Sequence, residues 1–193
     1  GCINLMPVDR WIIERCKQTI IKAMELLNQY EIGSARHEID DFFWKDFCDY
    51  YLEIVKARLY QPEKHGYEER KSAQHALYYA FLNILKMYAI YVPHITEYTY
   101  QKSFRQYEES ISLHKLQWEK ETNVDNQIIQ FGEKLKNIVA KARKYKSENN
   151  LSMKAEIEEV TVKVDGGKES DMVMQTIKDI KACCKAKKVK IVQ

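Results

Sequence analysis

The chain has 193 residues, a net charge of +3 and 45% hydrophobic residues, which fits one or two folded domains and excludes a disordered chain. No apolar run reaches the roughly 18 residues of a membrane span, and no secretory leader is recognised. We therefore expect a cytoplasmic protein with no membrane partner. The five cysteines are scattered without a Cys-x-x-Cys pair, and the histidines lack ligand spacing, so neither disulfides nor a bound metal are expected.

Positive charge is concentrated in the last third of the chain. Residues 1–123 contain 16 Lys and Arg against 18 Asp and Glu, whereas residues 124–193 contain 15 against 10. The balance therefore changes from −2 to +5 along the chain. This basic excess indicates where an anionic partner could bind.

The first half of the chain has the hydrophobic period of α-helices. A first helix is predicted after Pro7, with Asp9 as a possible N-cap and apolar residues spaced by three or four over 12–30. Gly33 breaks this pattern, and Ser34 can cap a second helix that runs to Leu59. Few glycines and prolines interrupt the chain, which also favours a mainly helical fold.

Further helices follow with shorter connections. A third helix is predicted over 69–92, a short fourth over 93–104 with Pro93 in its first turn, and a fifth over 128–145. Residues 105–123 show no clear period and are predicted to form an ordered loop. Together these helices form a predicted bundle over residues 1–150.

The hydrophobic period changes from helical to alternating after residue 150. The pattern predicts a strand over 157–164, a turn at 165–167, a short helix over 172–180 and a second strand over 189–192. A strand, a helix and a strand in this order imply a right-handed βαβ unit. We therefore predict a mainly α fold, with a helical domain at 1–150 and a small α/β (βαβ) appendage at 151–193 that packs on the helices or continues beyond Gln193.

The residues alone reveal no catalytic constellation. Gly-rich nucleotide loops, a P-loop and a Gly-x-Ser-x-Gly motif are all absent from the sequence. Asp46, Asp49 and Glu53 lie on one side of the predicted second helix, with Lys56 a turn further on. These residues could form an acid/base or metal site, but we favour a solvated charged face with a Glu–Lys pair.

Three stretches resemble class I aminoacyl-tRNA synthetases. Asp-Arg-Trp-Ile at 9–12 is similar to an opening shared by the valine, isoleucine and leucine enzymes, and Pro-His-Ile-Thr-Glu at 93–97 resembles a turn that they share. The run FFWKDFCDYYLE at 42–53 resembles the signature helix of the anticodon-binding domain of valyl-tRNA synthetases, and 51–56 does not match the Arg-rich run of isoleucyl enzymes. The resemblance covers about residues 8–150, and the end of the chain resembles the βαβ segment that follows this bundle in such enzymes.

This resemblance implies a helical bundle that binds the anticodon loop and stem of tRNA within a valine–tRNA ligase. The ATP-site motifs of the class, His-Ile-Gly-His and Lys-Met-Ser-Lys-Ser, do not occur. We therefore expect a C-terminal part of such an enzyme that holds no cofactor, contacts the ATP-using catalytic domain and does not activate valine by itself. Two alternatives stay open: a structural or interaction module that braces a catalytic domain, and the equivalent isoleucyl or leucyl domain.

Arg10, Trp11 and Arg15 are the predicted RNA-binding residues. Proteins bind unpaired bases by stacking them on aromatic rings or guanidinium planes and by hydrogen-bonding their edges. Arg10 offers a planar set of donors at the positive end of a helix, Trp11 offers a ring, and Arg15 follows one turn later. The resemblance implies that the Arg–aromatic pair faces the anticodon loop, whereas the alternative for Trp11 is a core residue that anchors the helix start.

Two further groups are candidates for RNA contacts. Phe42, Phe43 and Trp44 could form a stacking platform, although three consecutive helical residues spread over about 200°, so at least one must leave the core face. Basic residues of the fifth helix and the tail could hold phosphates or form a solvated basic face. These are Lys134, Lys136, Lys141, Arg143, Lys144 and Lys146, then Lys181, Lys185, Lys187, Lys188 and Lys190.

Overall fold

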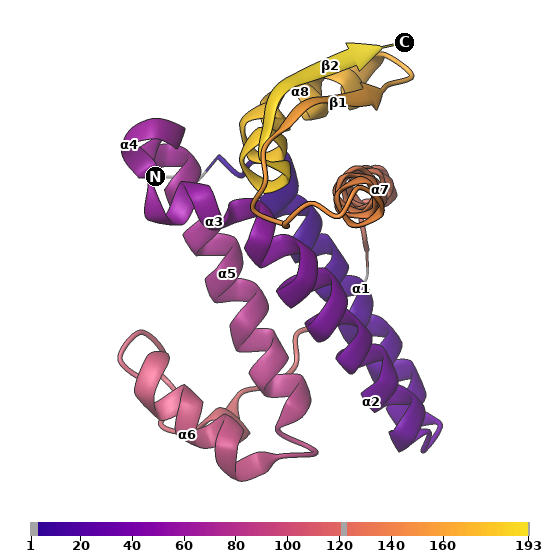
Figure 1. Ribbon diagram of the computed structural model, residues 1–193. Coiled ribbons are helices and arrows are strands. Elements are labelled where there is room, and N and C mark those ends of the chain that lie inside the picture. Colours follow the sequence, from indigo (N-terminus) through magenta and orange to yellow (C-terminus); the bar gives the residue numbers. More distant parts are fainter. Residues whose placement is uncertain (1–3, 121–122, 193) are drawn as a thin grey trace.

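A computed structural model describes residues 4–120 and 123–192, so Cys2 and residues 121 and 122 of the predicted loop lie outside the described residues. Long helices form a bundle, and a two-stranded sheet with its own helix lies at the C-terminal end (Figure 1). The predicted mainly α fold with a small α/β appendage is therefore confirmed. No helix in the described part of the chain has an apolar stretch long enough to cross a lipid bilayer.

Helix α1 (Pro7–Asn28) confirms the predicted apolar stripe as far as Ala23, because Ile12, Cys16, Ile20 and Ala23 are all buried, whereas Tyr30 lies beyond the helix and is 89% exposed. Proline suits its first turn, where the missing N–H would have no helical partner. The prediction that Asp9 caps this helix is wrong. The helix begins one turn earlier than that prediction requires, and the Asp9 carboxylate is buried among side chains of other helices.

The predicted second helix is a continuous helical rod with three parts. It consists of α2 (Ile32–Asp41), a π-helix η1 (Phe42–Tyr51) and α3 (Leu52–Tyr60). The π-helical middle was not predicted, and Ser34 lies inside α2 instead of capping it. In a π-helix the backbone bonds run from i to i+5, so this segment winds more slowly than the α-helices on either side.

The next elements complete the bundle. They are a one-turn helix α4 (Pro62–His65), the long α5 (Tyr67–Tyr88) and α6 (Pro93–Ser103), which agrees with the predicted fourth helix. The following loop contains a short 3₁₀ turn, η2 (Leu113–Lys115), and its described residues are ordered by Glu97 of α6. That carboxylate accepts hydrogen bonds from the Ser112 hydroxyl and from the Leu113 N–H, at 3.0 and 2.9 Å.

Helix α7 (Asn126–Glu148) crosses the bundle and leads to the βαβ unit. Strand β1 (Ile157–Lys163) pairs in parallel with β2 (Ala186–Val192), and the pairing runs from Ile157 opposite Ala186 to Lys163 opposite Val192. Helix α8 (Gly167–Cys184), which is longer than predicted, connects the two strands and packs on α3, α7 and α1. The buried side chains of this unit continue the main core of the bundle. A boundary at residue 150 therefore stays a prediction.

Candidate nucleic-acid interface

Arg10 lies on the surface at the start of α1, close to the start of α7. Its side chain is 47% exposed, and its Nη2 lies 3.3 Å from Oδ2 of Asp125. Asp125 is the N-cap of α7, because its other oxygen accepts hydrogen bonds from the N–H groups of Gln127 and Ile128. The structure thus places an accessible guanidinium beside two helix N-termini, a setting that favours anions.

Trp11 is wholly buried, with 0% of its surface exposed. Its ring meets Tyr51 edge-on at 6.5 Å between centroids, and α7 passes so closely that a Cβ on Gly132 would lie 1.9 Å from Trp11 Cδ1. The prediction that Trp11 presents a stacking face is therefore wrong, because Tyr51 of η1 and helix α7 cover the ring. The alternative, a core aromatic that anchors the start of α1, describes its position.

Arg15 is mostly buried and is engaged within the protein. Its Nε lies 2.7 Å from Asp46 Oδ2, and its guanidinium lies over the Phe42 ring at 6.0 Å. Asp46 also receives a hydrogen bond of 2.7 Å from Lys136 of α7. Burial lowers the pKa of Lys136, but the bonds to Asp46 and Glu133 outweigh this effect and raise it overall. Three elements, α1, η1 and α7, therefore meet at Asp46.

The acidic face predicted on the second helix is divided among different partners. Asp46 is bound as just described, Asp49 pairs with Arg143 of α7 at 3.1 Å, and Glu53 pairs with Lys56 at 3.5 Å. The Glu–Lys pair agrees with the favoured prediction. Asp46, in contrast, is not solvated but buried between two cations. Within the described ranges, no three His, Cys, Asp or Glu side chains are grouped as metal ligands.

A buried charge cluster that the sequence analysis missed joins the βαβ unit to the bundle. Arg58 of α3 donates to both oxygens of Asp9, at 2.8 and 3.1 Å, and its Nε lies 3.0 Å from Oδ1 of Asp179 on α8. The Tyr51 hydroxyl also donates to Asp9, at 2.7 Å, and the Ser72 hydroxyl donates to its other oxygen. No spacing in the sequence relates residues 9, 58 and 179, so periodicity could not reveal this cluster.

The Asp179 carboxyl is the least well satisfied member of this cluster. It is buried, and no described donor forms an aligned hydrogen bond with its Oδ1. Burial raises its pKa to about 7, an effect that the positive charge of Arg58 only partly opposes. The cluster therefore contains one carboxyl that takes up a proton near neutral pH.

The three consecutive aromatics of η1 face different directions, as their helical spacing requires. Phe42 is buried and Phe43 packs against the core, whereas Trp44 is 63% exposed. The Trp44 ring meets the Phe43 ring edge-on, with 4.8 Å between centroids. Trp44 is thus a large aromatic ring that solvent, or an unpaired base, can reach.

The cations of α7 fall into two groups. Those that face the bundle are used within the protein: Arg143 binds Asp49, and the Lys146 ammonium donates to the Met153 and Cys184 carbonyl oxygens at 2.9 Å each. Lys134 pairs with Glu169 of α8 at 2.7 Å. Lys141 faces a hollow between α7 and β1 and has no ion-pair partner among the residues that the structure describes.

Comparison with known proteins identifies the family. Residues 9–162 match the family described as the anticodon-binding domain of tRNA ligase. The chain is 34% identical over 193 residues to a valine–tRNA ligase of Thermococcus kodakarensis, an alignment that covers 98% of this chain and 21% of the relative. Similar relatives are the valine–tRNA ligases of Pyrococcus furiosus, 33% identical with 99% and 21% covered, and of Orientia tsutsugamushi, 34% identical with 95% and 22% covered.

The family match and the relatives differ in what they cover. The chain spans about a fifth of the length of these relatives, whereas the family match extends over most of the chain itself. The resemblance noted on three short stretches is therefore confirmed over a much longer region. From its match over residues 9–162, the chain belongs to the family of anticodon-binding domains of tRNA ligases.

Proposed function

We propose that this chain is the tRNA-recognition part of a valine–tRNA ligase and binds the anticodon loop and stem of the tRNA that accepts valine. The family match over residues 9–162 is the observation that carries this proposal, and the valine–tRNA ligase relatives support the choice of amino acid. The whole enzyme would join valine to its tRNA with ATP in the cytoplasm. The ATP site and the chemistry would lie in a catalytic domain that this chain contacts, so the chain alone would not activate valine.

Arg10 is the residue that we propose as a direct contact with the anticodon region. Its guanidinium is accessible and can bind a phosphate through two parallel hydrogen bonds or lie flat on a base. Arg15 is proposed as a secondary contact, since its side chain is mostly buried and is paired with Asp46. Trp11 would not contact RNA itself. Its buried ring packs against Gly132 and would hold the first turn of α1, and with it Arg10, in place.

A titration with two transcripts tests this proposal. The chain is titrated with labelled valine tRNA and with the same tRNA carrying a changed anticodon, at several salt concentrations. We expect tighter binding of the unchanged transcript, a preference that Arg10→Ala reduces and Arg10→Lys restores only in part. Lys22→Ala is the matched control, because Lys22 is an exposed cation on the same helix. Equal affinity for the two transcripts would refute anticodon recognition.

A structural module that braces a catalytic domain is the second candidate. It is favoured by the burial of Trp11 and by the internal pairing of Arg15, Lys136 and Arg143. RNA binding that does not change with salt concentration would support it, because phosphate contacts always give a salt dependence. Including isoleucine and leucine tRNAs in the same titration decides whether the amino acid is valine.

A further inference from the structure

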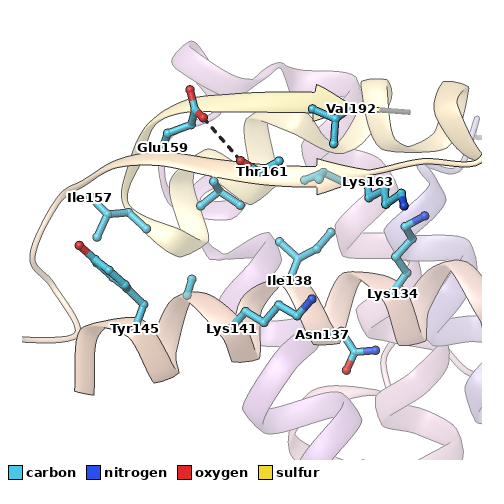
Figure 2. A pocket seen from close by; sticks show the side chains of 13 residues that line it. Lys134, Asn137, Ile138, Lys141, Tyr145, Ile157, Glu159, Thr161, Lys163 and Val192 are labelled. Carbon is cyan, nitrogen blue, oxygen red and sulfur yellow. Dashed lines mark hydrogen bonds between the residues drawn. The ribbon is translucent and has the colours of Figure 1, made fainter. Parts of the chain in front are cut away.

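A groove separates α7 from strand β1. Its volume is about 600 Å³, within the range of about 300–1,000 Å³ that is typical of ligand pockets. Figure 2 shows the amino groups of Lys134 and Lys163 at one end and the Tyr145 ring beneath Ile157 at the other. We call this feature the α7–β1 groove and define it by Lys134, Lys141, Tyr145, Ile157 and Lys163.

The charges of this groove are unbalanced. Lys134, Lys141 and Lys163 line it, and the lining residues include one carboxylate, Glu159. Figure 2 shows Glu159 on the side of β1 away from α7, where the Thr161 hydroxyl donates to it at 3.5 Å. Lys134 has Glu169 as a partner, but Lys141 and Lys163 have no ion pair with another described residue. The α7 cations that face the bundle are used internally, whereas these two remain available to an external anion.

The walls of the groove combine apolar side chains with the charges of the lysines. The inner wall is formed by Ile157, Val160 and Val162, which are buried, and the half-buried Ile138 and Val192 complete the apolar lining. Tyr145 is 53% exposed and lies at the end of the groove away from Lys134 and Lys163. Lysines that follow a backbone and an aromatic ring that stacks on a base are the usual means of binding unpaired nucleic acid.

We propose that the α7–β1 groove binds the phosphate backbone of an RNA, with Lys141 and Lys163 on phosphates and Tyr145 against a base. This inference rests on the proposed function, since it gives the same tRNA a second contact that does not depend on the anticodon sequence. The groove lies between α7 and β1, whereas Arg10 of α1 lies beside Asp125 at the start of α7. An RNA that occupies both would follow α7 from one end toward the other.

Charge reversal in the groove provides the test. The probes are the valine tRNA transcript and the transcript with a changed anticodon, and the variant is Lys141→Glu with Lys163→Glu. We expect weaker binding of both transcripts to the same degree, and a smaller slope of log affinity against log salt. The slope should fall by roughly 1.5 in total, because each phosphate contact contributes about 0.7–0.9. Lys141→Gln with Lys163→Gln repeats the test if the reversed variant does not fold.

Matched controls separate a local effect from a general one. Lys71→Glu with Lys102→Glu changes the net charge equally, on α5 and α6, which do not line the groove. Tyr145→Leu is expected to weaken binding about tenfold, whereas Tyr145→Phe retains the ring and should bind like the unchanged chain. Both lysine variants should melt at the temperature of the unchanged chain.

Several outcomes would overturn the inference. It fails if the groove variant keeps the affinity and slope of the unchanged chain, or if it loses no more affinity than the Lys71/Lys102 control. It also fails if a poly-glutamate peptide binds as tightly as RNA and depends on the same lysines. If the unchanged chain binds neither transcript, the proposed function fails with it, whereas retained anticodon preference with an unaffected groove variant removes the inference alone.

Discussion

Replacing Arg58 by methionine tests how the bundle holds the βαβ unit. Arg58 is 2% exposed, and its guanidinium lies between the carboxyl groups of Asp9 on α1 and Asp179 on α8. It also donates to the Glu69 carbonyl oxygen of α5 at 2.9 Å. Methionine fills a similar volume but carries no charge. The substitution therefore leaves the buried carboxyl groups of Asp9 and Asp179 without the guanidinium that lies between them.

The expected cost follows from this geometry. Removing one partner of a buried ion pair typically costs about 3–5 kcal/mol, because the remaining charge stays buried without compensation. A chain of this length loses about 2–4 °C of melting temperature per kcal/mol. We therefore expect the Arg58→Met variant to melt roughly 6–20 °C below the unchanged chain at pH 7.5. This is a large part of a total stability that is usually about 5–15 kcal/mol.

Circular dichroism during heating, together with urea titration, measures this loss. The deficit should become smaller at pH 5, because protonation removes the repulsion between the two carboxyl groups that Arg58 leaves behind. Lys56→Met on the same helix is the control; Lys56 is exposed, so its replacement should change stability by at most about 0.5 kcal/mol. A variant that melts within 2 °C of the unchanged chain, roughly one kcal/mol, would show that the ion cluster contributes little to stability.

Three further predictions concern other residues. Because burial raises the pKa of Asp179 to about 7 from 3.8, its stabilising contribution is complete below about pH 4 and is lost as the pH rises through 7. Urea unfolding from pH 5 to 8 should show this decline in the unchanged chain, and Asp179→Asn should remove it; parallel curves would contradict the assignment. Gly132→Ala should cost about 1–3 kcal/mol by overpacking Trp11, whereas Gly33→Ala, with open space around it, should be neutral or stabilising; equal melting temperatures would argue against the close approach. Trp44→Ala should leave the melting temperature within about 3 °C yet weaken tRNA binding, and unchanged tRNA affinity would exclude Trp44 as a stacking residue.

The helices with a regular hydrophobic period were predictable because their burial is decided along one face. In α1 the buried residues Ile12, Cys16 and Ile20 lie at helical spacing, and in α7 Ile128, Phe131, Leu135 and Ala142 do so, although Tyr145 of the same spacing is exposed. The βαβ unit was predictable for a similar reason, since a change of period marks a change of element. The predicted helix over 172–180 was too short. The sequence analysis assigned 165–167 to a turn, whereas α8 begins at Gly167, whose φ is +59°.

The π-helix was not predictable from a helical template of 3.6 residues per turn. Phe42, Asp46, Phe47 and Tyr51 are buried, and Phe42 is five residues from Phe47, as Asp46 is from Tyr51. An α-helix would spread such positions over more than one face. The aromatic run was recognised as unusual, but its local winding depends on packing against α1 and α5, which only the folded chain provides.

The candidate site was predictable only as far as it depends on local sequence. Arg10 lies at an accessible helix start, as expected, and its contact with RNA stays a prediction. Trp11 was misjudged because its cover comes from Gly132, which is distant in the sequence. The groove beside Lys141 and Lys163 likewise forms only when β1 is placed next to α7. Long-range packing thus decides which of the basic and aromatic residues face outward.

The helical rod that ends at Tyr60 also limits how the length of this chain can vary. Each residue of an α-helix turns the chain by about 100°, so deleting a single residue of α3 before Arg58 would rotate that arginine by a comparable angle about the helix axis. Arg58 would then point away from Asp9 and Asp179. Insertions and deletions in this rod are therefore as damaging as the loss of the arginine itself, even where every remaining side chain is kept. We expect homologous chains to vary in composition here far more readily than in residue number.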